Sequence, residues 1–150
     1  MSSIAGTNCP AGTYSDVTNV ISLATCKPCT GGYYCTGTGL ITPTGACTEG
    51  YYCTKNAIVA APPTLLAGSY GPCPVGYYCP TGSAAAVPCP PGTMNTLTLK
   101  ISVSNCLPCT AGSYCATVGR SAIEGLCAIG YYCPAGQMSP TPALYYCAKG

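Results

Sequence analysis

The chain has 150 residues with 19 Gly, 15 Pro and 15 Cys, and it lacks Trp, Phe and His altogether. Leu, Ile and Val are sparse and scattered, so an ordinary aliphatic core could not offset the conformational entropy lost on folding. Five basic and three acidic residues give a net charge of +2 without any basic run, which argues against nucleic-acid binding.

The abundance of cysteine instead predicts a disulfide scaffold from an oxidising, extracellular compartment. A reduced, zinc-binding chain is the alternative, but the absence of His and the Gly-Tyr-Tyr triplets beside the cysteines argue against it. The most apolar stretch, residues 57–67, is too short for a membrane span and contains two prolines. Residues 1–7 lack the charged start and apolar run of a signal peptide, so we expect an excerpt or mature fragment of a longer secreted protein.

A seven-residue motif, Cys-x-x-Gly-x-Tyr-Cys, recurs along the chain, and a further copy begins at Cys147. The five complete copies occupy residues 29–35, 47–53, 73–79, 109–115 and 127–133. Adding 80 to the positions of the first six cysteines gives the positions of six later ones without error. This period predicts a lead-in at 1–8, a first repeat at 9–88 and a truncated second repeat at 89–150, arranged as a linear array.

Local structure should consist of short hairpins and turns. Residues 12–25 and 92–105 alternate in polarity and carry β-branched residues, which predicts a two-stranded ribbon in each. Gly and Pro spacing nearly excludes helix, and the segments after the motifs are typical of turns. The expected fold is therefore small, disulfide-rich and irregular, with short β-hairpins, almost no helix and an elongated array of repeats.

Within the motif, Gly permits a tight turn, and Tyr places a large ring beside the sulfurs. Where two Tyr are adjacent, an extended backbone points one ring inward and the other outward. We expect the ring next to the cysteine to be structural in most copies and the other to be free for contact, although both could simply cover disulfides. We also include tyrosines next to the cysteines among the candidate contact residues, namely Tyr34, Tyr52, Tyr78 and Tyr132.

Disulfide connectivity cannot be read from sequence alone, but the period limits it. Spacing favours a crossed arrangement of the cluster, Cys29 with Cys47 and Cys35 with Cys53, repeated as Cys109 with Cys127 and Cys115 with Cys133. Two frames stay open for the remaining cysteines. One pairs Cys9 with Cys26, Cys89 with Cys106 and Cys73 with Cys79. The other pairs Cys73 with Cys89 and Cys79 with Cys106, leaves Cys9, Cys26 and Cys147 for partners outside the chain, and is preferred because it treats every motif alike.

The combination of Cys-Pro-x-Gly-Thr, Cys-x-Pro-Cys and Gly-Tyr-Tyr-Cys resembles the cysteine-rich repeats of ephrin-receptor ectodomains and of the TNF-receptor type. The crossed pairing is similar to that of a TNF-receptor module. Long runs of Gly-Tyr-Tyr-Cys also resemble surface and flagellar-hair (mastigoneme) proteins of protists and algae. The resemblance extends from Cys9 to Gly150, and it indicates module type rather than function.

No catalytic or cofactor chemistry is expected. Without His, neither a catalytic triad nor a Cys-His dyad can form, and Asp16, Glu49 and Glu124 are too far apart in sequence to suggest a paired-carboxylate or calcium site. The two Cys-x-x-Cys sequences repeat with the array and are interpreted as structural. Thr residues beside Pro are either plain turn residues or candidates for O-glycosylation, namely Thr42, Thr44, Thr64 and Thr141.

These features predict a structural segment of an extracellular filament, appendage or surface coat whose partners are other copies of itself. The apolar segment 57–67 is the candidate contact between subunits or repeats, with Ile58, Val59, Leu65 and Leu66 as its contact residues. We expect Ile58→Asp or Leu65→Asp to weaken assembly and leave single repeats folded. The alternative is a receptor or adhesion stalk that binds a protein ligand, which would need a charged or aromatic patch outside the repeat.

Overall fold

A computed structural model describes residues 6–63 and 70–147, and in this part of the chain it has short strands, turns and no α-helix. Two single 3-10 turns, η1 (Leu23–Thr25) and η2 (Val103–Asn105), are the closest approach to helix. The prediction of a small, disulfide-rich, mostly irregular fold is confirmed. The strands are β1 (Thr13–Tyr14), β2 (Lys27–Pro28), β3 (Tyr33–Tyr34), β4 (Gly45–Ala46), β5 (Tyr51–Cys53), β6 (Tyr70–Pro72), β7 (Tyr77–Tyr78), β8 (Val87–Pro88), β9 (Thr93–Met94), β10 (Leu107–Pro108), β11 (Ser113–Tyr114) and β12 (Gly125–Leu126).

Each strand pairs antiparallel with its neighbour in sequence, which makes a series of hairpins. The six sheets have two strands each, and an isolated bridge between Tyr131 and Tyr146 marks a seventh hairpin. Every hairpin begins at one cysteine and ends at the cysteine that starts the next. We number them 1 to 7, and they span residues 9–29, 29–47, 47–73, 73–89, 89–109, 109–127 and 127–147.

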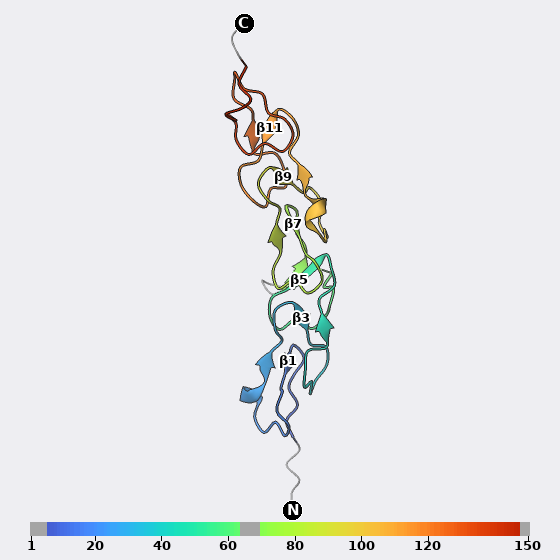
Figure 1. The fold of residues 1–150 in the computed structure, drawn as a ribbon. Helices are drawn as coiled ribbons and strands as arrows, with labels where there is room; N and C mark the ends of the chain where they lie inside the picture. The colour runs from blue at the N-terminus through green and yellow to red at the C-terminus, as the bar shows by residue number, and fades with distance from the viewer. Residues whose placement is uncertain (1–5, 64–69, 148–150) are drawn as a thin grey trace, which may run out of the picture. The chain divides into compact units, whose positions relative to one another are not determined.

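The hairpins fall into two compact units, one formed by residues 1–72 and 80–85, the other by residues 73–79 and 86–150. In the first unit, β1, β3 and β5 begin successive hairpins, and β7, β9 and β11 do so in the second (Figure 1). Hairpin 4 contributes its loop to the first unit and its strands to the second. The predicted ribbons are hairpins 1 and 5, whose return strands lie slightly later than expected, at β2 and β10.

Consecutive hairpins of a unit are joined by a repeated set of three backbone hydrogen bonds, which we call a rung. Between hairpins 1 and 2, Gly12 N–H donates to Cys35 C=O (2.9 Å), Ser15 N–H to Leu40 C=O (2.9 Å), and Gly39 N–H to Cys9 C=O (2.8 Å). The same three positions are joined between hairpins 2 and 3, 4 and 5, 5 and 6, and 6 and 7. Because the rung uses only main-chain groups, it tolerates the variable side chains of the loops.

The third bond of each rung comes from a loop residue with a left-handed backbone. Gly39, Gly119 and Gly136 take this conformation at φ between 68° and 83°, and Asn56 and Leu99 take it at 57° and 62°. This conformation is strained for a leucine, whereas Gly and Asn adopt it readily. The rung therefore imposes a backbone geometry at one fixed place in every loop.

Sulfur and backbone make up the interior. Among the described residues, twelve cysteines are buried, whereas every Leu, Ile and Val is exposed except Val20 and Leu40, which are half-buried. One small cluster combines Cys47, Cys53, Ala57 and Tyr70. The absence of buried Leu, Ile and Val from the described chain agrees with the composition, which cannot supply an oily core.

The predicted crossed disulfides are wrong. Glycine at the fourth motif position turns the chain back, so the first and seventh residues come within bridging distance, with Cα atoms 5.9 Å apart for Cys29 and Cys35 and 6.3 Å for Cys47 and Cys53. Each complete motif therefore closes on itself. The motif disulfides are Cys29–Cys35, Cys47–Cys53, Cys73–Cys79, Cys109–Cys115 and Cys127–Cys133.

The remaining cysteines follow the first of the two frames, not the preferred one. Cys9 pairs with Cys26 and Cys89 with Cys106, each across 17 residues, so Cys9 and Cys26 do not need partners outside the chain. Hairpins 1 and 5 lack the second motif cysteine and place buried Ser15 and Asn95 there instead. Cys147 is the free cysteine of the described chain.

Candidate self-association surface

The aliphatic side chains form the outer surface of both units. Twenty-two large hydrophobic residues in the described chain are exposed, against eight charged residues in the whole sequence. Ile21 is 81% exposed, Leu144 86% and Ile129 fully exposed. Aliphatic residues are normally among the most buried, so this inversion identifies the surface of the chain as its most unusual feature.

Several exposed residues recur at the 80-residue spacing. Val17, Ile21 and Leu23, the first residue of η1, lie in the loop of hairpin 1. Their equivalents in hairpin 5 are Leu97, Ile101 and Val103, the first residue of η2. All six are exposed. The loops of hairpins 1 and 5 therefore present the same kind of apolar surface in the two units.

The predicted contact segment is partly built into the fold. Ala57 is fully buried, and its C=O accepts a hydrogen bond from Cys35 N–H (2.8 Å). Ile58 and Val59 follow it and are 40% and 38% exposed. A Cβ added at Gly12 would lie 3.4 Å from the Cγ2 of Ile58, so this side chain also packs within its own unit. Leu65 and Leu66 lie outside the described residues.

The tyrosines next to the cysteines differ in exposure. Tyr34 is partly buried against the Cys47–Cys53 cluster, and its ring covers Gly45 on the opposite strand. Tyr52 and Tyr78 are also partly buried. Tyr132 is exposed, and its ring meets Tyr145 edge to face at a centroid distance of 5.3 Å. Of the four candidate contact rings, Tyr132 is thus the one most open to a partner.

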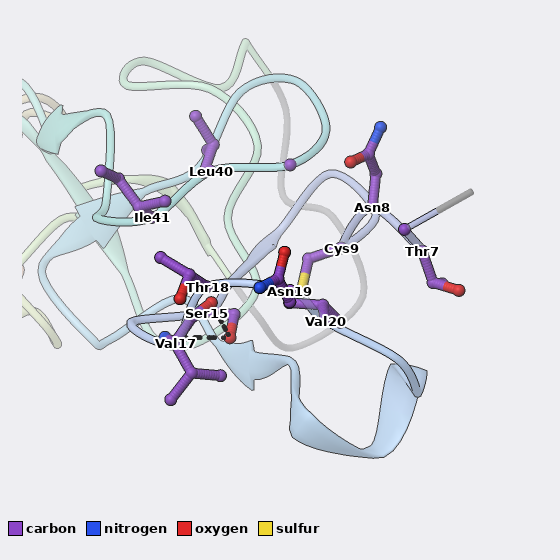
Figure 2. Close-up of a pocket in the computed structure, with 12 residues that line it drawn as sticks. Thr7, Asn8, Cys9, Ser15, Val17, Thr18, Asn19, Val20, Leu40 and Ile41 are labelled. Carbon is purple, nitrogen blue, oxygen red and sulfur yellow. Dashed lines mark hydrogen bonds between the residues drawn. The ribbon is translucent and has the colours of Figure 1, made fainter. Parts of the chain in front are cut away.

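A cleft of about 280 Å³ lies at hairpin 1 (Figure 2). Residues 6–9 form one side, the 15–20 loop another, and residues 39–41 from hairpin 2 the third. The cleft is lined by Val20 and Leu40, the half-buried Leu, Ile or Val residues of the described chain. Ser15, which also lines it, is buried, and its Oγ accepts a hydrogen bond from Val17 N–H (3.4 Å). The volume lies just below the usual range for small-molecule pockets.

The acidic residues with resolved partners serve local structure. Asp16 forms an exposed ion pair with Lys27 (2.7 Å), and this bond lowers the pKa of the Asp16 carboxyl. Glu124 accepts hydrogen bonds from Ala116 N–H (2.8 Å) and Thr117 N–H (3.0 Å), and the bond from Thr117 is the main cause of the lowered pKa of its carboxyl. These carboxylates fasten their own hairpins and do not share a site.

The remaining sequence candidates lie as follows. The cysteines of each Cys-x-x-Cys sequence belong to different disulfides, since Cys26 pairs with Cys9 and Cys29 with Cys35. Thr42 and Thr141 are exposed, as is Thr44, whose Oγ1 accepts a hydrogen bond from Thr36 N–H (3.0 Å). Thr64 lies outside the described residues.

Sequence reasoning missed the rungs and the cleft, although the rungs have a signal in the sequence. A left-handed residue follows the first cysteine of each hairpin by nine or ten positions, and it is usually Gly or Asn. Residues that recur at a fixed distance from a motif indicate a repeated backbone geometry.

Within residues 6–63 and 70–147, none of the secondary structure is a helix with the length and hydropathy of a membrane span. Seven disulfides are typical of proteins that fold in an oxidising environment. No protein-family model matches the chain, and a comparison with curated proteins finds no match.

Proposed function

We propose that this chain is a structural segment of an extracellular filament, appendage or surface coat, in which its apolar surface is covered by other copies. The observation that carries the proposal is the exposure of nearly every described Leu, Ile and Val. Covering one such side chain in an interface is worth about 1.5–3 kcal/mol, so a few of them are enough to drive association.

The low charge supports the same conclusion. Eight charged residues in 150 leave little electrostatic repulsion between copies, and the formal net charge is +2. Soluble monomers of this size usually carry more surface charge, which opposes self-association. The disulfides add resistance to unfolding, which an extracellular filament or coat requires.

Extracellular location rests on the disulfides, and glycosylation is a further part of the proposal. Exposed Thr42, Thr44 and Thr141 lie beside prolines, and glycans there would keep the chain soluble before assembly. Their mass would be seen directly in intact-protein mass spectrometry of native material.

Sedimentation velocity of the oxidised chain over a range of concentrations, followed by negative-stain electron microscopy, tests the proposal. We expect concentration-dependent growth into fibres or sheets. A chain that stays a discrete monomer at high concentration would contradict the proposal and favour a receptor or adhesion stalk.

A further inference from the structure

Hairpin 5 carries a strained leucine on its surface. Leu99 takes the left-handed backbone of the rungs with φ of 62°, whereas the equivalent residue of each other hairpin is Gly or Asn. Its side chain is 44% exposed and belongs to no buried cluster of the described chain. Strained residues persist where a function or the surrounding structure requires them. The fold accepts Gly or Asn at this place, so the leucine indicates a contact that lies outside the described chain.

A hollow of about 180 Å³ lies in hairpin 5, and its lining includes Lys100, the residue that follows Leu99. Met94 and Leu107, which are opposite each other in β9 and β10, form its apolar lining together with Leu97. Leu97 and Leu107 are 58% and 62% exposed. The hollow is smaller than a usual small-molecule pocket, but a cavity of about 150 Å³ already holds a benzene-sized group. It can therefore accept one aliphatic side chain of a partner.

Most polar side chains around the hollow are already bonded within the chain. Asn95 is buried and forms hydrogen bonds with backbone groups of hairpins 4 and 5. The Oδ1 atom of Asn105 accepts hydrogen bonds from two backbone N–H groups just before η2, each at 3.2 Å. The hydroxyl of Ser104 lies 2.6 Å from that of Ser102. A polar ligand would find few free groups here, so the hollow suits an apolar guest.

The equivalent place in hairpin 1 is closed by charge. Asp16 and Lys27 form their ion pair (2.7 Å) at the positions that correspond to Thr96 and Leu107 in hairpin 5. The left-handed residue of hairpin 1 is an asparagine. The two repeats share their cysteine spacing and three exposed aliphatic positions, but only hairpin 5 combines an apolar hollow with the strained leucine.

We propose that the hairpin-5 face, formed by Met94, Leu97, Leu99 and Leu107, binds the same face of a second copy. Leu107 of each copy enters the hollow of the other, and the contact covers Leu99 of both. This inference rests on the proposed function and names one of its interfaces.

A second copy is the occupant because the hairpin-5 face carries both parts of the contact. It has a projecting leucine and a hollow that fits one, so it complements itself about a two-fold axis, as an isologous interface requires. Lys100, the one charged side chain of the lining, is half-buried, and its ammonium group can stay in water at the rim. An isologous pair closes on itself, so growth into a filament or coat uses other exposed residues such as Ile41.

Each test variant takes the residue that the other repeat has at the equivalent place, so the fold already accommodates it. Leu99→Asn removes the strained leucine and takes the residue of position 19. The double variant Thr96→Asp with Leu107→Lys closes the hollow with the ion pair of hairpin 1 and leaves the net charge unchanged. The control, Ile41→Ser, removes an isoleucine of hairpin 2 that is 67% exposed and takes the residue of position 121. Far-UV circular dichroism and a non-reducing disulfide map confirm that each variant is folded.

Sedimentation velocity of the oxidised full chain gives the dissociation constant of the pair. We expect Leu99→Asn to raise it about ten-fold and the double variant about a hundred-fold, because an isologous contact contains each change twice. Ile41→Ser should change it less than about two-fold. In unfolding at concentrations where the wild type is monomeric, Leu99→Asn should be more stable than the wild type. A purely structural role for Leu99 would not give opposite effects on stability and association.

Nuclear magnetic resonance of mixed labelled and unlabelled wild-type chains identifies the contact directly. We expect intermolecular nuclear Overhauser effects between the methyl groups of Leu107 and Met94. Effects that connect only other surfaces, wild-type affinity in both hairpin-5 variants, or an equal loss in the control would overturn the hairpin-5 contact and leave the proposed function standing. A wild-type chain that stays monomeric at high concentration would overturn both.

Discussion

Asn95 fills the place of a motif cysteine, and its replacement by Ala tests how hairpin 5 is held without that sulfur. Its side chain is buried, the Nδ2 group donates to Tyr77 C=O in hairpin 4 (2.9 Å), and Oδ1 accepts from Leu97 N–H (3.0 Å). The amide thus links two hairpins and shapes the loop that follows. Asn95→Ala removes both bonds without disturbing any disulfide.

The expected cost is about 2–3 kcal/mol, because each lost bond contributes about 1 kcal/mol net and the Tyr77 carbonyl, in a partly buried position, is left without this donor. Asn95→Ser provides the graded comparison, since Ser occupies the equivalent position 15 and keeps an acceptor for Leu97 N–H. It loses only the bond to Tyr77, so about 1 kcal/mol is expected. Ser15→Ala should cost less than Asn95→Ala, because the Ser15 hydroxyl makes only local contacts with Val17.

Guanidinium chloride unfolding of the oxidised variants, followed by tyrosine fluorescence, gives the free energies of unfolding. Repeat arrays can unfold in parts, so amide exchange in hairpins 4 and 5 should accompany it. We expect the order wild type, Asn95→Ser, Asn95→Ala from most to least stable. Equal stabilities for Ser and Ala, or a loss below about 0.5 kcal/mol for Ala, would refute the role of the Tyr77 bond.

Three further predictions concern strain, charge and surface. Leu99→Asn should stabilise the chain by about 1 kcal/mol in the same unfolding assay, because Asn adopts the left-handed backbone of Leu99 more readily than leucine does. Asn56 already occupies an equivalent position. A loss of stability would contradict this prediction. The carboxyl of Glu124 has a lowered pKa in the folded chain, so its bonds to Ala116 and Thr117 contribute their full stabilisation at pH values above the ordinary pKa of 4.5. This stabilisation is lost as the pH falls through the lower pKa of the folded chain. The protection factor of the Thr117 amide, which compares its exchange rate with the intrinsic rate at the same pH, should therefore fall in acid, whereas Glu124→Gln should lower it at neutral pH and remove the acid dependence. Ile21→Asp should raise the concentration needed for assembly about ten-fold and leave the fold intact. Thr42→Asp adds the same charge at an exposed polar site and should raise that concentration less. Equal increases for the two variants would show that charge alone is responsible.

The fold class could be predicted because composition determines it. A chain without enough aliphatic residues and with frequent Gly and Pro has few alternatives to disulfide-linked hairpins. The pairing could not be predicted from the period, because self-closed motifs and crossed motifs repeat equally well every 80 residues. Hairpins 1 and 5 held the missing signal: Cys9 and Cys89 have no cysteine six positions later but have one 17 positions later. If every complete motif closes on itself, only Cys147 is left without a partner.

The rungs were missed because they join main-chain groups, which composition does not distinguish, and because their signal in the sequence is a single Gly or Asn in most of the loops. Leu99 hides the pattern further, since leucine is not expected at a left-handed position. The extent of the exposed aliphatic surface was also missed, because the contact was placed in a single segment, residues 57–67. Ile21 and Ile129 show instead that the apolar surface spreads over both units.

The disulfides themselves differ in how much they stabilise. In the loop-entropy description a six-residue loop contributes about 2 kcal/mol and a 17-residue loop about 3 kcal/mol. Five of the seven bridges are of the shorter kind, so they hold single hairpins together without joining one hairpin to the next. The rungs must therefore supply the order between hairpins.

Non-reducing peptide mapping of the native chain tests most directly whether the two cysteines of each motif are bonded to each other. Chymotrypsin cuts after Tyr34 and Leu40 would separate the peptides that carry Cys29, Cys35 and Cys47. We expect the Cys29 peptide to be linked to the Cys35 peptide, and the Cys47 peptide to that of Cys53. Linkage of Cys29 to Cys47, or a majority of free thiols, would contradict the account.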